Sequence, residues 1–289
     1  MKLGRRAVIG VPFLWLLVFF LLPFLVVARI SVSEMAGAAI HFGPRFDNYL
    51  LLVQDSLYLR TYVSSLKYAA VTTLLCLAIG YPFAYFMARA RKSLQPALLM
   101  LVMLPFWTSF LLRVYAWKAL LSEQGLIANA IAATGLDHAL AWAGLIPGPG
   151  QLMNTPFSLV LGMTYTYLPF MILPLYSNLA KMDLRLLEAA ADLGATAWTA
   201  FWRVTVPLSR AGIIAGAMLV FIPCVGEYVI PELLGGPQTQ MIGRTLWDEF
   251  FSNNDWPMAC AVAVTMVLLV IVPVAVFSRN QPEASEQRA

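Results

Sequence analysis

Residues 8–28 read VIGVPFLWLLVFFLLPFLVVA, an apolar run without a single charge. About 20 such residues are the length that a helix needs to cross a bilayer. The run is too long for a secretory signal and has no small-residue cleavage site, so we expect a retained membrane span. Similar apolar runs recur along the chain, near residues 65–88, 97–120, 157–179, 210–231 and 258–277.

The composition of the whole chain agrees with membrane insertion. Of its 289 residues, 60% are hydrophobic and 12% are charged, whereas roughly a quarter of the residues in a soluble domain are charged. Only helices and closed barrels satisfy their backbone polar groups in lipid, and the continuous runs differ from the alternating pattern of barrel strands. We therefore predict an all-α membrane protein, a single transmembrane domain over residues 1–289 with six spans.

The placement of charge predicts the orientation. If both termini lie in the cytoplasm, the inner segments hold 12 of the 19 Lys and Arg but only five of the 15 Asp and Glu. The terminal members of this basic set are Lys2, Arg5, Arg6 and Arg288. Because Lys and Arg concentrate on the inner side of membrane proteins, we expect both termini to be cytoplasmic. The basic excess then reflects contact with inner-leaflet lipid, and we do not expect nucleic acid as a partner.

Residues 181–210, between the fourth and fifth apolar runs, carry more charge than the runs around them. Asp183 is a plausible N-cap, and the apolar residues after it recur near helical spacing. Gly194 would end this short helix, and a second short piece leads to Pro207. Two short helices joined at a glycine suit the docking of a soluble partner; an ordinary amphipathic helix at the membrane surface is the alternative.

Within this segment, Glu188-Ala189-Ala190, Gly194 and Val204-Thr205-Val206-Pro207 resemble the EAA motif of permease subunits in bacterial binding-protein-dependent ABC importers. The Ile and Leu that usually precede the proline are both Val here. The resemblance implies the type I ABC importer permease fold, a multi-pass inner-membrane location, and a coupling helix within 184–203 that sits in a groove on a separate ATPase. The residues that it implicates in ATPase coupling are Glu188, Ala189, Ala190, Asp192, Gly194 and Pro207.

Three further stretches, residues 105–109, 112–117 and 226–236, resemble the polyamine branch of this family, and residues 241–257 are most similar to its putrescine permease subunit. The resemblance implies ATP-driven import of putrescine, with spermidine also open, from periplasm to cytoplasm by alternating access. The implied partners are a second homologous permease, a cytoplasmic ATPase dimer and a periplasmic polyamine-binding protein. ATP and Mg would be bound by the ATPase, and this chain would need no cofactor. Ferric iron, an opine or another small cation are the alternative solutes.

The last outer loop and its flanks carry several acids against a single base, Arg244. Such a mouth attracts cations, and Tyr and Trp rings can hold an ammonium group by cation–π contact. The alternative is that outer loops are acidic only as the counterpart of the basic inner ones. The candidate pathway residues are Glu227, Tyr228, Glu232, Trp247, Asp248 and Asp255, together with Tyr165 and Tyr167 of the fourth run, for which packing is the competing role.

Glu227 stands apart from the other acids because of its depth. Counting about 1.5 Å per residue from the start of the fifth run puts it about 25 Å along the helix. Ionisable residues at such depth usually face the protein interior or a watery cavity. Pro223, Gly226 and Pro231 surround it and predict a kinked or broken helix. A structural ion pair with Arg113 is the alternative to a role in the substrate pathway.

Several chemistries have no motif in this sequence. No Gly-Lys dipeptide is present for a Walker loop, and neither His-Glu-x-x-His nor Gly-x-Ser-x-Gly occurs, so we do not expect an enzyme. Cys76, Cys224 and Cys260 fall in apolar runs without ligand spacing, which indicates packing roles and no metal site. An ion-coupled secondary transporter, the rival class, would be expected to have internal repeats and charges near mid-membrane. No clear repeat is visible, and the deepest charges lie toward the outer side.

Overall fold

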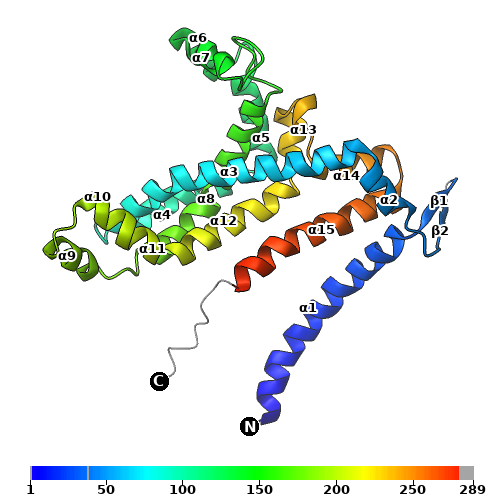
Figure 1. Cartoon of the computed structure of the whole chain (residues 1–289), viewed down its shortest axis with the longest axis horizontal. Helices are drawn as coiled ribbons and strands as arrows, with labels where there is room; N and C mark the ends of the chain where they lie inside the picture. Colours follow the sequence, from blue (N-terminus) through cyan, green and yellow to red (C-terminus); the bar gives the residue numbers. More distant parts are fainter. Residues whose placement is uncertain (1, 38, 280–289) are drawn as a thin grey trace. The chain divides into compact units, whose positions relative to one another are not determined.

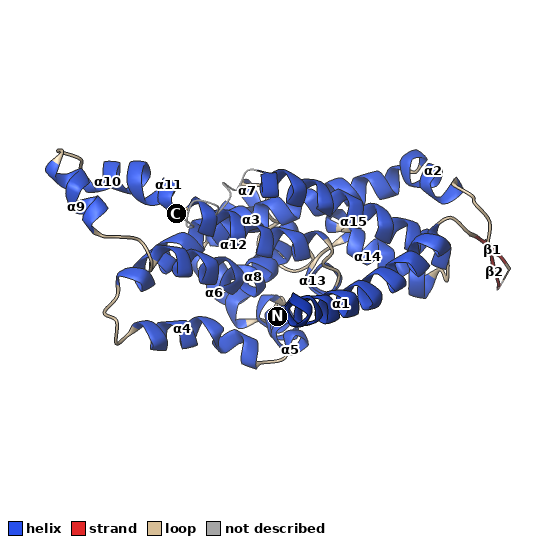
Figure 2. Cartoon of the chain, turned by 90° about the horizontal axis from the view of Figure 1, so that it is seen from below, coloured by secondary structure: helices blue, strands red, loops and turns tan. Residues whose placement is uncertain are grey.

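The computed structural model describes residues 2–37 and 39–279, without the side chains of residues 2–7, 272–274 and 276–279. The regular secondary structure in this part of the chain is helical apart from one two-stranded hairpin (Figure 2). The chain divides into two compact units, which we call unit 1 (Met1–Tyr62 with Ile242–Val272) and unit 2 (Val63–Met241 with Pro273–Ala289). Each unit is described by itself.

Unit 1 combines segments from both ends of the sequence. Its elements are α1 (Lys2–Ser31), the antiparallel strands β1 (Glu34–Ala36) and β2 (Ala39–His41), α2 (Asp47–Gln54), the first turns of α3 (Ser56–Arg89), α14 (Ile242–Trp247), a π-helix η4 (Asp248–Ser252) and most of α15 (Trp256–Arg279) (Figure 1). Its core includes Tyr62, Ile242 and Val262. The Tyr62 hydroxyl donates to the carbonyl of Val262 at 2.8 Å, so the two ends of the sequence are joined by a buried hydrogen bond.

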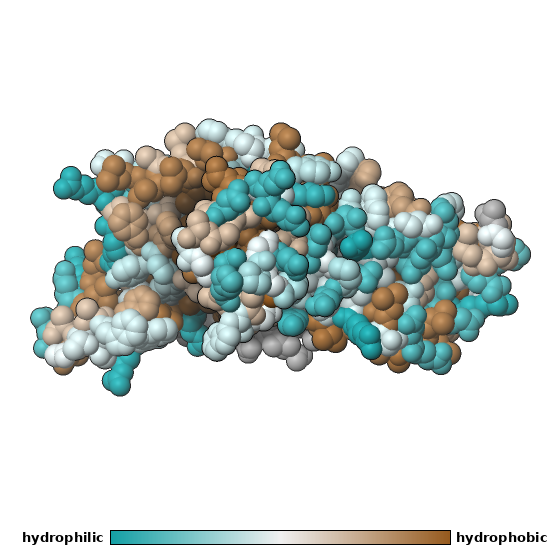
Figure 3. Space-filling view, turned by 90° about the horizontal axis from the view of Figure 1, so that it is seen from above, coloured by the Kyte–Doolittle hydropathy of each residue, from teal (hydrophilic) through white to brown (hydrophobic). Residues whose placement is uncertain are grey.

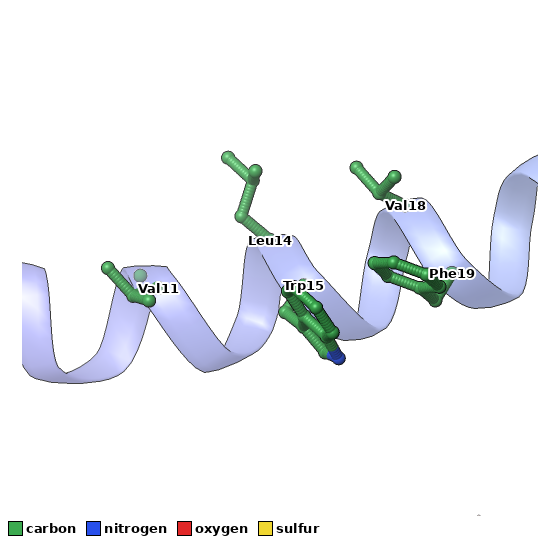
Figure 4. Close-up of a pocket in the computed structure, with 6 residues that line it drawn as sticks. Val11, Leu14, Trp15, Val18 and Phe19 are labelled. Atoms are coloured by element: carbon green, nitrogen blue, oxygen red, sulfur yellow. The ribbon is translucent and has the colours of Figure 1, made fainter.

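Helix α1 leaves its apolar side chains uncovered. None of its most hydrophobic stretch is buried inside the protein. Figure 4 shows Val11, Leu14, Trp15, Val18 and Phe19 along this helix, where the rings of Trp15 and Phe19 stack with their centroids 4.2 Å apart. In water such a surface would drive aggregation, so lipid or another membrane-embedded surface must be its environment.

Unit 2 contains the remaining helices. They are the rest of α3, α4 (Gln95–Met103), the 3-10 turn η1 (Leu104–Trp107), α5 (Phe110–Leu121), α6 (Leu126–Thr134), α7 (Leu136–Trp142), α8 (Pro156–Leu179), α9 (Arg185–Asp192), α10 (Ala197–Ala200), the π-helix η2 (Phe201–Thr205), α11 (Val206–Leu208), α12 (Arg210–Val225), α13 (Val229–Leu234) and the 3-10 turn η3 (Pro237–Thr239). Helix α8 is the most buried of the long apolar helices and packs along α12.

Small residues set the close approach of α8 and α12. A Cβ added to Gly216 would lie 2.7 Å from the sulfur of Met171, and one added to Gly212 would lie 2.8 Å from Cβ of Asn178. Membrane helices use such glycines because direct backbone contact replaces the hydrophobic driving force that lipid does not provide. This small-residue face of α12 therefore packs against α8 of the same chain.

Three helices are long and apolar enough to cross a membrane: residues Val8–Ser31 of α1, α3 and α8. Two bent helix pairs pass the same test together, which gives up to five candidate spans, and Trp256–Ile271 is a shorter apolar helix. The protein is thus a mostly helical membrane protein with three to five candidate spans among the described residues. The terminal charges Lys2, Arg5, Arg6 and Arg288 lie outside the described side chains, so the predicted orientation stays a prediction.

Two of the expected spans are not continuous helices. The run expected at 97–120 is interrupted, with α4–η1 and α5 bent by 86°. Pro105 lies at the interruption and has no N–H for a helical hydrogen bond, and Thr108 is extended with ψ 150°. The run expected at 210–231 ends as a helix at Val225, and its start is bent by 64° from the preceding helical segment.

The segment between α5 and α8 holds a helical lobe. Helices α6 and α7 meet at Gly135, whose φ of +70° gives a left-handed turn, and they extend beyond α5 (Figure 1). The lobe has its own small core, formed by Leu121, Ala128, Ile146 and Leu152. Trp142, at the end of α7, is 92% exposed.

Large apolar side chains reach the surface in both units, and brown patches are open to view in Figure 3. The free cysteines Cys76, Cys224 and Cys260 are all buried, as packing residues are.

Candidate functional sites: the coupling segment and the Glu227 junction

The coupling segment, residues 181–210, folds as two short helical pieces joined at a glycine, as the sequence predicts. Helix α9 precedes Gly194, and α10, η2 and α11 follow it. These elements project beyond the ends of α8 and α12 in both ribbon views (Figures 1 and 2). The predicted N-cap, Asp183, lies one residue too early, because Leu184 holds that position in α9 without a side-chain cap. Asp183 still accepts a hydrogen bond from the N–H of Arg185 at 3.0 Å, in the first turn of the helix.

Gly194 ends α9 in a Schellman-type turn. Its φ is +82°, a left-handed conformation that residues with a side chain rarely adopt. The N–H of Gly194 donates to the carbonyl of Ala191 at 2.9 Å, and the N–H of Ala195 donates to the carbonyl of Ala190 at 2.9 Å. These two bonds satisfy carbonyls at the end of α9 and reverse the chain toward α10.

The residues of the EAA-like motif are mostly open to a partner. Glu188, Ala189, Asp192 and Gly194 are exposed, and Ala190 is half-buried. Leu193 beside them is 89% exposed. Pro207 is also exposed, but it lies inside α11, and the fifth apolar run begins as a separate helix at Arg210. Pro207 therefore belongs to a short helix before the bend, and the long helix of the fifth run starts after it.

An aromatic cluster, which we had not predicted, holds the second half of the coupling segment against α3. The ring of Phe201 makes edge contacts with Tyr81 at 5.6 Å and Tyr85 at 5.9 Å between centroids. The hydroxyls of Tyr81 and Ser209 are 2.9 Å apart and buried. The sequence offers one sign of this cluster, because Tyr81 and Tyr85 lie one helical turn apart. Their partner Phe201 could not be predicted, since it is about 120 residues away in sequence.

Glu227 lies at the break between α12 and α13, as its surrounding glycine and prolines predict. Its Oε1 accepts hydrogen bonds from the N–H groups of Tyr228 at 3.2 Å and Val229 at 3.1 Å. Its Oε2 accepts one from the hydroxyl of Tyr167, on α8, at 2.5 Å. The carboxylate therefore caps the start of α13 and ties the broken helix to the middle of α8.

Arg113 does not pair with Glu227 in the described structure. Its guanidinium lies over the rings of Phe106, at 5.8 Å, and Phe110, at 5.9 Å. Phe106 in turn packs edge-on against Phe170 of α8, at 5.1 Å. The geometry replaces the ion-pair alternative with cation–π contacts at the start of α5.

Three other pathway candidates in unit 2, on α8 and at α13, differ in their surroundings. Tyr165 packs edge-on against Trp117 at 5.3 Å, which agrees with the packing role. Glu232 is exposed on α13, and Tyr228 beside Glu227 is half-buried. The structure thus brings together Tyr167, Glu227 and Tyr228, and leaves Tyr165 against another ring.

The remaining candidates lie in unit 1, where they have local structural partners. Asp248 lies 4.0 Å from Arg244, one turn earlier. Asp255 accepts the N–H of Met258 at 3.0 Å and so caps α15. Trp247 packs against Phe251, with ring centroids 4.0 Å apart.

Glu249 is an acid that was not among our candidate site residues, and it is buried in unit 1. Its two oxygens accept hydrogen bonds from the hydroxyl of Tyr58 at 2.7 Å and from the amide of Asn253 at 2.9 Å. Nothing local in the sequence marks this role, because Tyr58 is 191 residues away. Across the described residues, no three His, Cys, Asp or Glu side chains gather so that they could hold a metal ion.

The structure combines long apolar helices with an exposed segment, residues 181–210, that carries the EAA-like motif. This combination is expected of a membrane transport component. The chain belongs to the family described as binding-protein-dependent transport system inner membrane component, which matches residues 76–278. It is therefore a multi-pass permease of the inner membrane, from a family of ABC importer subunits that is non-catalytic, and it is not an enzyme.

Two relatives and one solved structure show what the chain is similar to. The spermidine/putrescine transport system permease protein PotB of Haemophilus influenzae is 37% identical, over 95% of this chain and 93% of the relative. PotB of Escherichia coli K12 is 38% identical, over 92% of this chain and 93% of the relative. A crystal structure of a bacterial alginate ABC transporter, in complex with alginate pentasaccharide-bound periplasmic protein, is similar with a TM-score of 0.66 at 17% identity, covering 95% of this chain and 94% of that chain. This last likeness shows the fold.

Proposed function

We propose that this chain is the transmembrane permease subunit of an ATP-driven importer that moves polyamines, putrescine with spermidine also open, from the periplasm to the cytoplasm. The observation that carries the proposal is similarity to spermidine/putrescine permeases along more than nine-tenths of the chain. A match over 95% of the chain extends well beyond residues 181–210. Such coverage supports a shared function of the whole chain more than a shared motif alone would.

The proposed assembly contains a second, homologous permease, a cytoplasmic ATPase dimer and a periplasmic polyamine-binding protein. In this arrangement the chain has the type I importer permease fold, with six spans and both termini in the cytoplasm. The exposed Glu188 and Asp192, and the turn at Gly194, would meet the ATPase, which binds ATP and Mg. Closure of the ATPase dimer would then bias the permeases between inward-open and outward-open states.

The proposed solute pathway uses the carboxylate of Glu227, with Tyr167 and Tyr228 beside it. A carboxylate and aromatic faces are the groups that hold ammonium ions. The outer acids Glu232, Asp248 and Asp255 would raise the local concentration of cations. Asp248 and Asp255 have the local partners described above, so attraction at a distance is a better-supported role for these two acids than direct contact with the solute.

The decisive experiment is uptake by the whole complex in proteoliposomes. This chain, the second permease and the ATPase are reconstituted with the binding protein outside and labelled putrescine as the solute. We expect uptake that depends on ATP. Unlabelled spermidine should compete with labelled putrescine, whereas ferric iron or an opine should not. Uptake driven by an ion gradient without ATP would instead indicate a secondary transporter, and uptake of iron or opine alone would move the chain to another branch of the same family.

A further inference from the structure

Phe201 is the centre of the contact between the coupling segment and a long membrane helix. Its ring meets the edges of Tyr81 and Tyr85, which lie on the same face of α3 one turn apart. The interplanar angles are 87° and 86°, a preferred geometry for aromatic pairs. Trp202 packs against Phe201 as well, at 5.3 Å, but it is 52% exposed.

A second tie supports the same contact. The hydroxyls of Tyr81 and Ser209 lie 2.9 Å apart, and Ser209 is fully buried. The coupling segment is therefore fastened to α3 near both the beginning of η2 and the end of α11. Helix α9 differs, because none of its residues is buried and its principal contacts are with α10 and η2. A force applied to α9 thus reaches α3 through η2.

Helix α3 continues the connection into the membrane. Gly80, next to Tyr81, approaches α8 so closely that an added Cβ would lie 3.1 Å from Cγ of Met171. Met171 is fully buried and also meets Gly216 of α12. Because packed interiors shift between discrete arrangements rather than deforming smoothly, movement of α3 at Tyr81 must be accommodated at this contact with α8.

We propose that Phe201 is the positioning residue through which displacement of the coupling segment moves α3 and, through it, α8. The ring acts as a wedge against two tyrosines of one helix, so it resists displacement along that helix as well as across it. This inference rests on the proposed function, because it assumes that an ATPase acts on the coupling segment. It adds the route by which that action reaches the helix that carries Tyr167.

The test compares variants on the two sides of the contact in the complete reconstituted complex. Phe201→Ala removes the aromatic ring from the coupling segment. Tyr85→Leu removes one of the two rings that it contacts on α3, outside the coupling segment. Three quantities are measured for each: ATPase co-purification, ATP hydrolysis and putrescine taken up per ATP hydrolysed. We expect both variants to bind the ATPase and hydrolyse ATP within about twofold of the wild type, while uptake per ATP falls by about tenfold or more.

Two further variants keep the result interpretable. Phe201→Tyr retains the ring and should restore uptake per ATP to within about twofold of wild type. Phe201→Leu retains most of the buried volume, so it replaces Phe201→Ala if that variant does not assemble.

The proposal is overturned if uptake per ATP is unchanged, or if ATPase binding is lost in proportion to transport, since Phe201 would then be a docking residue. Absence of putrescine uptake by the wild-type complex would instead refute the proposed function.

Discussion

At the scale of single residues, a mutation can separate the structural role of Glu227 from its proposed role in the solute pathway. Its carboxylate caps α13 through backbone N–H groups and accepts the hydroxyl of Tyr167. Glutamine has nearly the same shape and can still accept from the N–H groups, so Glu227→Gln should preserve the cap while removing the charge. We expect uptake of putrescine to fall by about tenfold or more, equivalent to about 1.4 kcal/mol of lost cation binding.

Initial uptake rates in proteoliposomes check this expectation, with Glu123→Gln, an exposed acid in the lobe, as the control. Tyr167→Phe leaves the charge in place and removes one hydrogen bond, so its effect should be the smaller one. Unchanged kinetics for Glu227→Gln would show that the carboxylate is only a helix cap.

At the scale of elements, the turn after α9 depends on the left-handed backbone of Gly194. Valine there would have to adopt a φ of +82°, which costs about 1–2 kcal/mol. We expect Gly194→Val to insert into the membrane but to lose ATPase co-purification. Gly144 is a matched control, because its φ is +69° and an added Cβ would also meet open space, yet it lies in the lobe after α7. If Gly144→Val and Gly194→Val lose the ATPase equally, the effect is general destabilisation.

The contact between α8 and α12 depends on the absence of a side chain at Gly216. A valine there would press on the sulfur and the backbone of Met171, 2.7 and 3.1 Å from the added Cβ. Overpacking of this kind costs about 1–3 kcal/mol, so we expect a lower midpoint of thermal unfolding for Gly216→Val in detergent. Gly10→Val, in α1, meets no atom within 4 Å and should unfold like the wild type. Equal midpoints for the two variants would show that α8 and α12 can separate without loss.

At the scale of the whole molecule, the proposed topology puts the lobe and the coupling segment on opposite sides of the membrane. Trp142→Cys in the lobe and Asp192→Cys in the coupling segment are both at exposed positions, whereas the native cysteines are buried. An impermeant maleimide should label Trp142→Cys in spheroplasts and Asp192→Cys only after permeabilisation. The opposite pattern would invert the predicted orientation, and labelling of both from one side would refute the span count.

The amino-acid sequence by itself determined the helical membrane class, the break at Glu227 and the turn at Gly194. These features depend on local properties: the length of apolar runs, the missing N–H of proline and the conformational freedom of glycine. Only the tertiary structure decided which residues contact one another across the fold. The contacts of Phe201 with α3, of Tyr167 with Glu227 and of Gly216 with Met171 join residues distant in the chain. An apolar run specifies that a helix enters lipid, but not which of its faces meets another helix, since that depends on the shapes of both surfaces.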